Sequence, residues 1–168
     1  IVKVSGAFVA DTSCSQAGTY TNTWTVNDDC GNTSLVYTQI ITIEDTTSPT
    51  WDTAATTLDT TLECSDTTGL ASAQALFPAA SDLCDVDVSD IVKVSGAFVA
   101  DTSCSQSGSY TSTWTVNDDC GNTSLVYTQV ITIEDTTSPT WDTAISALDT
   151  TLECSDTAGL ASAQALFP

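Results

Sequence analysis

The side chains that could do chemistry in this sequence are nearly all carboxylates and thiols. Its 168 residues include 22 Asp and Glu and seven Cys, whereas the only basic side chains are Lys3 and Lys93 and there is no His. Without His, a Ser or Cys nucleophile lacks its usual base. Without Arg, there is no bidentate clamp for a phosphate or carboxylate substrate.

Carboxylates alone could still hydrolyse a glycoside, but that reaction needs two of them facing one cleft. The obvious pair, Asp28 and Asp29, is adjacent in the sequence and recurs as Asp118 and Asp119. Neighbouring residues of an extended chain point to opposite faces, so neither pair meets this requirement. We therefore expect that the protein is not an enzyme.

The net charge restricts the partners. The formal charge is −20 at pH 7. Nucleic-acid binding needs clustered Lys or Arg to neutralise phosphates, and anionic lipid would repel this chain. No apolar run approaches the roughly 18 residues that a membrane span requires. We expect no nucleic-acid partner and no direct membrane insertion.

The sequence repeats with a fixed period. Residues 1–78 recur at 91–168 with an offset of 90 residues, and only eight positions differ. Solenoid turns take roughly 20–50 residues, so a period of this length instead suits small domains joined like beads on a string. The chain therefore contains one full repeat and most of a second.

Each period contains four cysteines, an even number. The chain contains Cys14, Cys30, Cys64, Cys84, Cys104, Cys120 and Cys154, and an eighth would fall just past residue 168. No C-x-x-C pair and no His offers a zinc site. We therefore expect disulfides, and with them an oxidising location outside the cytoplasm.

Alternation of apolar and polar residues predicts strands. In residues 20–26 the apolar side chains fall on one face and threonines on the other, which is the pattern of a half-buried strand. Residues 35–43 show it again, and the turn-rich residues 27–32 predict a hairpin tip between the two. Further strands are expected at 91–100, around Trp51 and at 58–64.

One segment of the repeat has a helical pattern. Residues 69–77 are rich in Ala, follow the candidate N-cap residues Asp66 and Thr67, and end at Pro78. Their apolar stripe predicts a short helix that covers a core.

A polar stretch marks the domain boundary. Residues 44–50 contain a proline, follow a predicted strand and recur at 134–140, so we interpret them as a linker. The chain then comprises the last strands of one repeat (1–47), a complete repeat (48–137) and the first part of the next (138–168). Short strands and regular turns over about 90 residues predict an all-β, immunoglobulin-like sandwich in a tandem array, with one short helix per repeat.

Acidic residues gather at the loops expected beside the linker. Ca²⁺ takes about six to eight oxygen ligands, which carboxylates from three segments could supply, and the ion would stiffen the junction between repeats. The other interpretation is a hydrated acidic surface that keeps a long array soluble. Ca²⁺ is the only cofactor that the sequence suggests. Its candidate ligands are Glu44, Asp45, Asp82, Asp85, Asp118 and Asp119.

Four cysteines per repeat allow three pairings. The loop with Cys84 and the hairpin tip with Cys120 are both expected at the N-terminal end of the sandwich, so we pair these two. Cys64 and Cys104 are expected at the opposite end and form the second pair. The alternative is a sheet-to-sheet bridge between Cys64 and Cys120, as in antibody domains. The cysteines left for partners outside this chain are Cys14, Cys30 and Cys154.

Five segments resemble the HYR-like repeats of the giant SprB-type surface adhesins of gliding Bacteroidetes, which are exported by type IX secretion. The segments are TWTVNDDCGNTS, YTQIITIEDTTSPTW, LECSD, AQALFPAASDLCD and IVKVSGAFVADTSC. The resemblance spans the whole period, and the order of the segments agrees. It implies an immunoglobulin-like sandwich, a cell-surface location and a role in adhesion or gliding motility.

Threonine is abundant, and β-branched residues suit the exposed faces of strands. Four Asp-Thr sequences are also similar to the O-glycosylation motif of Bacteroidetes, in which Asp is followed by Ser or Thr and then by a small or aliphatic residue. The candidate acceptors are Thr46, Thr53, Thr60 and Thr67.

These features predict two alternative functions. The first is a structural stalk or extender module of a long surface adhesin, whose main partners are the neighbouring repeats of the same chain. The second is weak binding of surface polysaccharide by each repeat, multiplied by avidity. Trp24 and Trp114 lie on the predicted apolar face. Trp51 and Trp141 follow the linker proline, where a Trp more often anchors a strand than binds a ligand. Buried tryptophans would favour the stalk.

Overall fold

The computed structural model describes residues 1–167. It is mostly β-sheet with two short helices, and it divides into a unit of residues Ile1–Asp135 and a second unit that begins at Thr136. The strands are β1 (Val2–Ser5), β2 (Val9–Ala10), β3 (Gly18–Thr25), β4 (Tyr37–Ile43), β5 (Thr50–Trp51), β6 (Thr60–Glu63), β7 (Ala80–Ser81), β8 (Ile91–Ser95), β9 (Val99–Ala100), β10 (Gly108–Val116) and β11 (Tyr127–Glu134). The helices are α1 (Thr67–Gln74) and α2 (Thr157–Gln164). Of the described residues, neither helix is long and apolar enough to cross a membrane.

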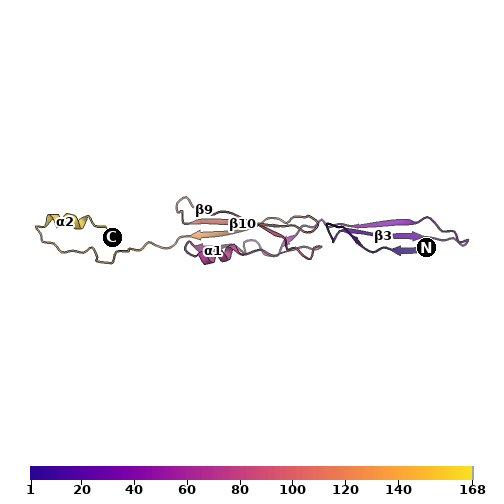
Figure 1. Cartoon of the computed structure of the whole chain (residues 1–168), viewed down its shortest axis with the longest axis horizontal. Coiled ribbons are helices and arrows are strands. Elements are labelled where there is room, and N and C mark those ends of the chain that lie inside the picture. Colours follow the sequence, from indigo (N-terminus) through magenta and orange to yellow (C-terminus); the bar gives the residue numbers. More distant parts are fainter. Residues whose placement is uncertain (168) are drawn as a thin grey trace. The chain divides into compact units, whose positions relative to one another are not determined.

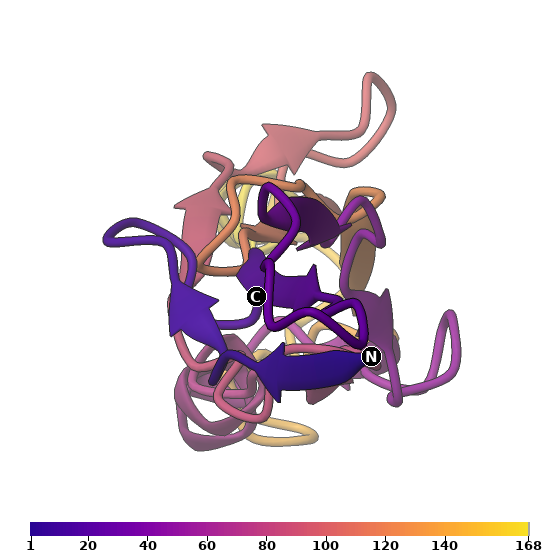
Figure 2. The same ribbon diagram turned by 90° about the vertical axis from the view of Figure 1, so that its right-hand side faces the viewer.

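The repeated sequence builds the same sheet twice. β3 pairs with β4, and β10 with β11, in one antiparallel register: Gly18 faces Ile43 just as Gly108 faces Ile133. On the other edge of the central strand lie β1 and β2 in the first copy, and β8 and β9 in the second. The central strands β3 and β10 are labelled in Figure 1, and Figure 2 shows the indigo N-terminal sheet from its end.

The second copy gains further strands and a helix. β6 joins the sheet parallel to β11, and β5 pairs with β7 in a separate two-stranded sheet, with Trp51 opposite Ala80. Figure 1 shows α1 running beside the sheet that contains β10. These elements, all within residues 48–135, place two β layers and a helix around one core, an arrangement consistent with a β-sandwich.

The core lies between β10, β11 and α1. Trp114 has no exposed surface, and its ring meets Phe77 and Tyr127 edge-on, with centroids 6.1 and 5.9 Å away. Ala73 of α1 packs with Ile131 and other apolar side chains of β11. The apolar face predicted from alternation is therefore the face that α1 and the aromatic residues cover.

The first copy of the sheet has no such cover among the described residues. β4 is exposed along its whole length, whereas β11, with nearly the same sequence, alternates between buried and less buried positions. The difference arises because α1 and β5 pack only on the second copy. Burial in this repeat is therefore set by what packs on the sheet, because the strand sequence itself is almost unchanged.

The helix begins earlier and ends earlier than predicted. Asp66 is the N-cap, and one of its carboxylate oxygens accepts a hydrogen bond from the Gly69 amide at 2.8 Å, so α1 starts at Thr67. Pro78 disfavours helical backbone in the residue before it, and the helix ends at Gln74. The same cap recurs in α2, where Asp156 accepts from Gly159.

The strand predicted at 91–100 is divided into β8 and β9. Gly96 lies at the break, and its amide donates to the carbonyl of Thr111 at 2.8 Å. A Cβ atom at Gly96 would lie 2.5 Å from that carbonyl oxygen, so only glycine allows this close approach of the two backbones. The predicted strands at 35–43 and 58–64 are confirmed with shorter bounds.

Candidate functional site

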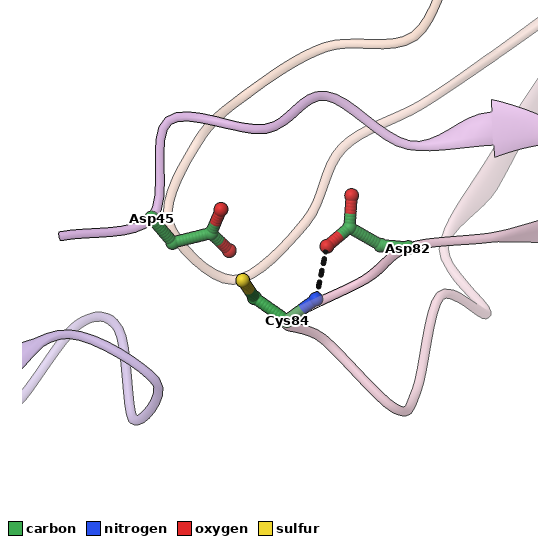
Figure 3. A group of neighbouring side chains, drawn as sticks. All are labelled: Asp45, Asp82 and Cys84. Atoms are coloured by element: carbon green, nitrogen blue, oxygen red, sulfur yellow. Dashed lines mark hydrogen bonds between the residues drawn. The ribbon is translucent and has the colours of Figure 1, made fainter.

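An acidic cluster lies where the linker after β4 meets the loop after β7. Asp45 comes from the linker, and Asp82 and Cys84 come from the loop. One carboxylate oxygen of each aspartate and the sulfur of Cys84 all lie within 4.8 Å of one another. Figure 3 shows these three side chains converging from the two segments. Both aspartates are half-buried, and Cys84 is exposed.

Local turns orient the two carboxylates. Asp82 Oδ1 accepts from the amides of Cys84 at 2.8 Å and Asp85 at 3.1 Å. Asp45 Oδ1 accepts from the amide of Thr47 at 3.0 Å. In both residues Oδ1 is therefore engaged in its own turn. The two Oδ2 atoms are buried and have no hydrogen-bond partner.

The hairpin tip between β10 and β11 packs beside this cluster. The Asn122 side chain donates to the carbonyl of Asp45 at 3.2 Å and to Asp118 Oδ2 at 2.8 Å. Asp85 Oδ2 accepts from the amide of Asp119 at 3.1 Å. Asp85 and Asp118 are buried, and these hydrogen bonds hold the tip against the loop.

The six predicted calcium ligands therefore separate into three groups. Asp45 and Asp82 come together, and each has one buried oxygen that accepts no hydrogen bond. Asp85 and Asp118 lie close by, but backbone amides and Asn122 occupy their oxygens. Glu44 and Asp119 are exposed, and neither belongs to the cluster.

Neither basic side chain lies at this cluster. Lys93 Nζ lies 4.9 Å from the ring centroid of Trp114 and donates to the carbonyl of Gln74. Lys3 Nζ lies 5.4 Å from the ring centroid of Trp24. Partial removal from water, followed by the charges of Asp45 and Asp82, raises the pKa of the Cys84 thiol.

A second cluster comprises Glu63, Cys64 and Asp135, whose ligand atoms also lie within 4.8 Å of one another. Asp135 is the counterpart of Asp45 in the next period. Partial removal from water, and then the charge of Asp135, raises the pKa of Cys64. The sequence analysis missed Glu63 and Asp135, although the offset of 90 residues from Asp45 could have identified Asp135.

The disulfide differs from the predicted pairing. The structure joins Cys120 to Cys14, which we had assigned to a partner outside the chain, and leaves Cys84 as a free thiol. Gln16 Oε1 lies 3.9 Å from Cys14 Sγ and 4.0 Å from Cys120 Sγ, so the loop before β3 packs on the hairpin tip. The prediction paired cysteines only within one repeat and did not anticipate this contact between repeats.

The other predicted pair is close but not bonded. Cys64 and Cys104 are free thiols, and the charge of Cys104 contributes to the raised pKa of Cys64. The Ser107 hydroxyl, which donates to Cys104 Sγ at 3.4 Å, lowers the pKa of Cys104. The alternative bridge from Cys64 to Cys120 is not formed. Cys30 and Cys154 are exposed free thiols.

The four candidate glycosylation sites differ in accessibility. Thr46 and Thr67 are exposed. The Thr53 hydroxyl accepts from the amide of Ala79 at 2.8 Å, and Thr60 is half-buried in β6. An enzyme that modifies the folded repeat would therefore reach Thr46 and Thr67 more readily than the other two.

Trp51 anchors the strand that follows the linker. Its indole N–H donates to the carbonyl of Leu125 at 2.7 Å, and its ring meets Tyr127 edge-on, with centroids 5.6 Å apart. The anchoring role expected for a Trp at this position is thus confirmed for Trp51, whereas Trp141, its counterpart in the next period, is 77% exposed. Trp51 and Tyr127 also line a shallow hollow of about 490 Å³ on the surface.

Comparison with known families identifies the repeated domain. The model of the LRR adjacent family, a domain found next to leucine-rich repeats, matches residues 6–53 and again residues 96–143. The two matches together cover more than half of the chain. The chain belongs to the LRR adjacent family.

The two matches are 90 residues apart and agree with the internal repeat. Each contains one hairpin, β3–β4 or β10–β11, and the linker that follows it. The family unit therefore spans the boundary that we placed at the linker. No curated protein and no solved structure matches the chain.

Proposed function

We propose that this chain is a segment of a long extracellular stalk, in which immunoglobulin-like repeats act as extender modules of a cell-surface adhesin. The main support for the proposal is that the same antiparallel sheet, with the same strand register, forms again 90 residues further along the chain. Both the sequence and its strand pairing repeat almost unchanged. Such repetition is typical of a tandem array of domains that acts as a spacer. The resemblance to HYR-like repeats of SprB-type adhesins supports a role in adhesion and gliding, with export by type IX secretion.

The use of aromatic residues favours a stalk over a sugar-binding module. Trp114 is fully buried, and Trp51 is held by Leu125 and Tyr127 within the fold. The charge of −20 also suits a spacer, because like-charged molecules repel one another and resist aggregation. The chemistry available in the sequence supports no catalytic role.

The test is a series of tandem arrays with one, two and four complete repeats, measured by small-angle scattering. We expect the maximum dimension to rise by a constant increment per repeat, on the order of 30 Å, the length of a nine-residue strand. A maximum dimension that grows only weakly with repeat number would contradict the stalk. Protease shaving of intact cells should release peptides of the repeat if it is displayed at the surface.

A glycan array tests the alternative function of weak polysaccharide binding. The full chain and a Trp51→Ala variant should both give only background signal if the repeat is a spacer. Binding that Trp51→Ala abolishes would instead assign the hollow beside Tyr127 to a sugar.

A further inference from the structure

The cluster at the linker contains two carboxylate oxygens that the protein itself does not satisfy. Asp45 Oδ2 and Asp82 Oδ2 are both buried and accept no hydrogen bond. Burying an anionic oxygen without a partner is costly, and placing two such groups together adds repulsion between them. The two basic side chains of the chain are engaged elsewhere, over Trp24 and Trp114. A bound cation would offset this charge.

We propose that Asp45 and Asp82 bind one Ca²⁺ ion between their two carboxylates, each of which has one buried oxygen that accepts no hydrogen bond. Ca²⁺ binds oxygen ligands at about 2.3–2.6 Å, so two oxygens on one ion lie at most about 5 Å apart. The ligand atoms of this cluster lie within 4.8 Å of one another and meet that limit. Water completes the coordination, as is common where a protein supplies few ligands.

The ion connects two segments of the chain. Asp45 belongs to the linker that leaves β4, and Asp82 belongs to the loop that leaves β7. A shared ion therefore ties the linker to the repeat that follows it. That this stiffens a stalk rests on the proposed function, whereas the binding of Ca²⁺ does not.

Cys84 lies within reach of the same position and defines the competing metal. A thiolate favours Zn²⁺, whereas Ca²⁺ prefers oxygen. Each carboxylate of the cluster has one oxygen without a hydrogen-bond partner, so we assign the site to Ca²⁺. The sulfur of Cys84 lies nearby but is not a ligand in this assignment. A Cys84→Ser variant separates the two assignments, because it removes only the sulfur.

The experiment is a calcium titration of the full chain by isothermal calorimetry, with thermal unfolding in calcium and in EDTA. Asp45→Asn and Asp82→Asn keep the Oδ1 atoms that form the turns and remove one charge each. Each should raise the calcium Kd by about tenfold or more, since even outer-shell changes at metal sites cost tenfold. Without calcium, each should unfold at the same or a higher temperature, because repulsion is relieved.

Glu44→Gln is the matched control. It removes the same charge from the neighbouring exposed residue and should leave the calcium Kd unchanged, as should Cys84→Ser. Equal weakening by Glu44→Gln and Asp45→Asn would overturn the site and indicate diffuse attraction to an acidic surface. Binding of Zn²⁺ alone, lost in Cys84→Ser, would overturn the assignment to calcium. The proposal would also be overturned if calcium produced neither a heat of binding nor a change in the unfolding temperature. The proposed stalk function would still be tested separately by the small-angle scattering of tandem arrays.

Discussion

Asp28 organises the tip of the first hairpin through hydrogen bonds to its carboxylate. Oδ2 accepts from the Asn32 side chain at 2.8 Å, and Oδ1 accepts from the amides of Asn32 and Cys30 at 2.8 and 3.0 Å. These bonds, led by the one from the Asn32 side chain, lower the pKa of Asp28. The two bonds from Asn32 recur in the second hairpin, where Asn122 donates to Asp118.

The lowered pKa of Asp28 predicts how the hairpin tip responds to acid. The folded tip favours the ionised carboxylate, so ionised Asp28 stabilises the folded protein. This stabilisation is fully present above the ordinary carboxyl pKa of the unfolded chain, and it is lost as the pH falls through the lowered pKa of the folded tip. Titration of the Asp28 carboxyl by NMR should show the lowered pKa, and Asn32→Ala should raise it toward the ordinary value. An Asp28 pKa that Asn32→Ala leaves unchanged would show that the side-chain bond is not its main cause.

Thr56 has left-handed backbone, with φ of 65°, and its counterpart Ser146 has φ of 69°. This backbone conformation costs any residue with a Cβ atom about 1–2 kcal/mol, and glycine avoids that cost. Glycine also has more conformational freedom in the unfolded chain, which offsets part of the gain in stability. Thr56→Gly should therefore stabilise the repeat by about 0.5–1 kcal/mol in urea unfolding. Thr57→Gly, one residue on and without positive φ, should not stabilise it. A gain of similar size at both positions would show that the strain at Thr56 is not the cause.

Gln129 joins β11 to the segments that cover it. The side chain is fully buried, and its Nε2 donates to the carbonyls of Leu58 at 2.7 Å and Ala73 at 3.1 Å. It therefore connects the sheet both to the turn before β6 and to helix α1. Its counterpart in β4, Gln39, is exposed and accepts one bond from Asn22 at 3.2 Å.

This pair of glutamines gives a matched test of the covering layer. Gln129→Leu removes the side-chain donor of the Leu58 carbonyl and one of the two donors of the Ala73 carbonyl, so it should lower the free energy of unfolding by about 2 kcal/mol. Gln39→Leu should lower it by about 1 kcal/mol or less, because the position is exposed and only the bond from Asn22 is lost. Chemical denaturation of the two variants checks this difference. Similar losses in both would mean that α1 does not pack on β11 in solution.

The link between Cys14 and Cys120 joins residues 106 positions apart and connects the N-terminal sheet to the next repeat. In the chain-entropy account a loop of this length stabilises by about 4–5 kcal/mol. If every repeat junction carries this bond, neighbouring modules of the array are covalently connected outside the backbone. A pulling force would then be shared between the linker and the disulfide.

The pairing of cysteines is directly measurable. The bond from Cys14 to Cys120 leaves five free thiols in the chain, whereas the predicted pairs Cys64–Cys104 and Cys84–Cys120 would leave three. We expect thiol titration of the unfolded, unreduced protein to give five. Non-reducing peptide mapping should recover a linked Cys14–Cys120 peptide. A count of three with a Cys84–Cys120 peptide would show that the disulfides form within each repeat.

Local patterns were enough to predict most of the elements of the chain. Alternating threonines and apolar residues predicted β3 and β10, because the two faces of a strand differ in burial. Asp66 and Thr67 were both candidate N-caps, because either side chain can satisfy a helix amide directly, and Asp66 takes this position. The break between β8 and β9 was missed, because the crowding at Gly96 comes from Thr111 on another strand.

Composition and repetition alone therefore predicted a β-rich, acidic, tandemly repeated chain without histidine chemistry, because those properties depend only on which residues are present and how they are spaced. The tertiary structure decided which acidic residues meet. Asp45 and Asp82 converge while their neighbour Glu44 does not, and Cys120 lies against Cys14 rather than bonding Cys84. These outcomes depend on how loops distant in sequence pack at the end of a sheet, and no local spacing encodes that packing.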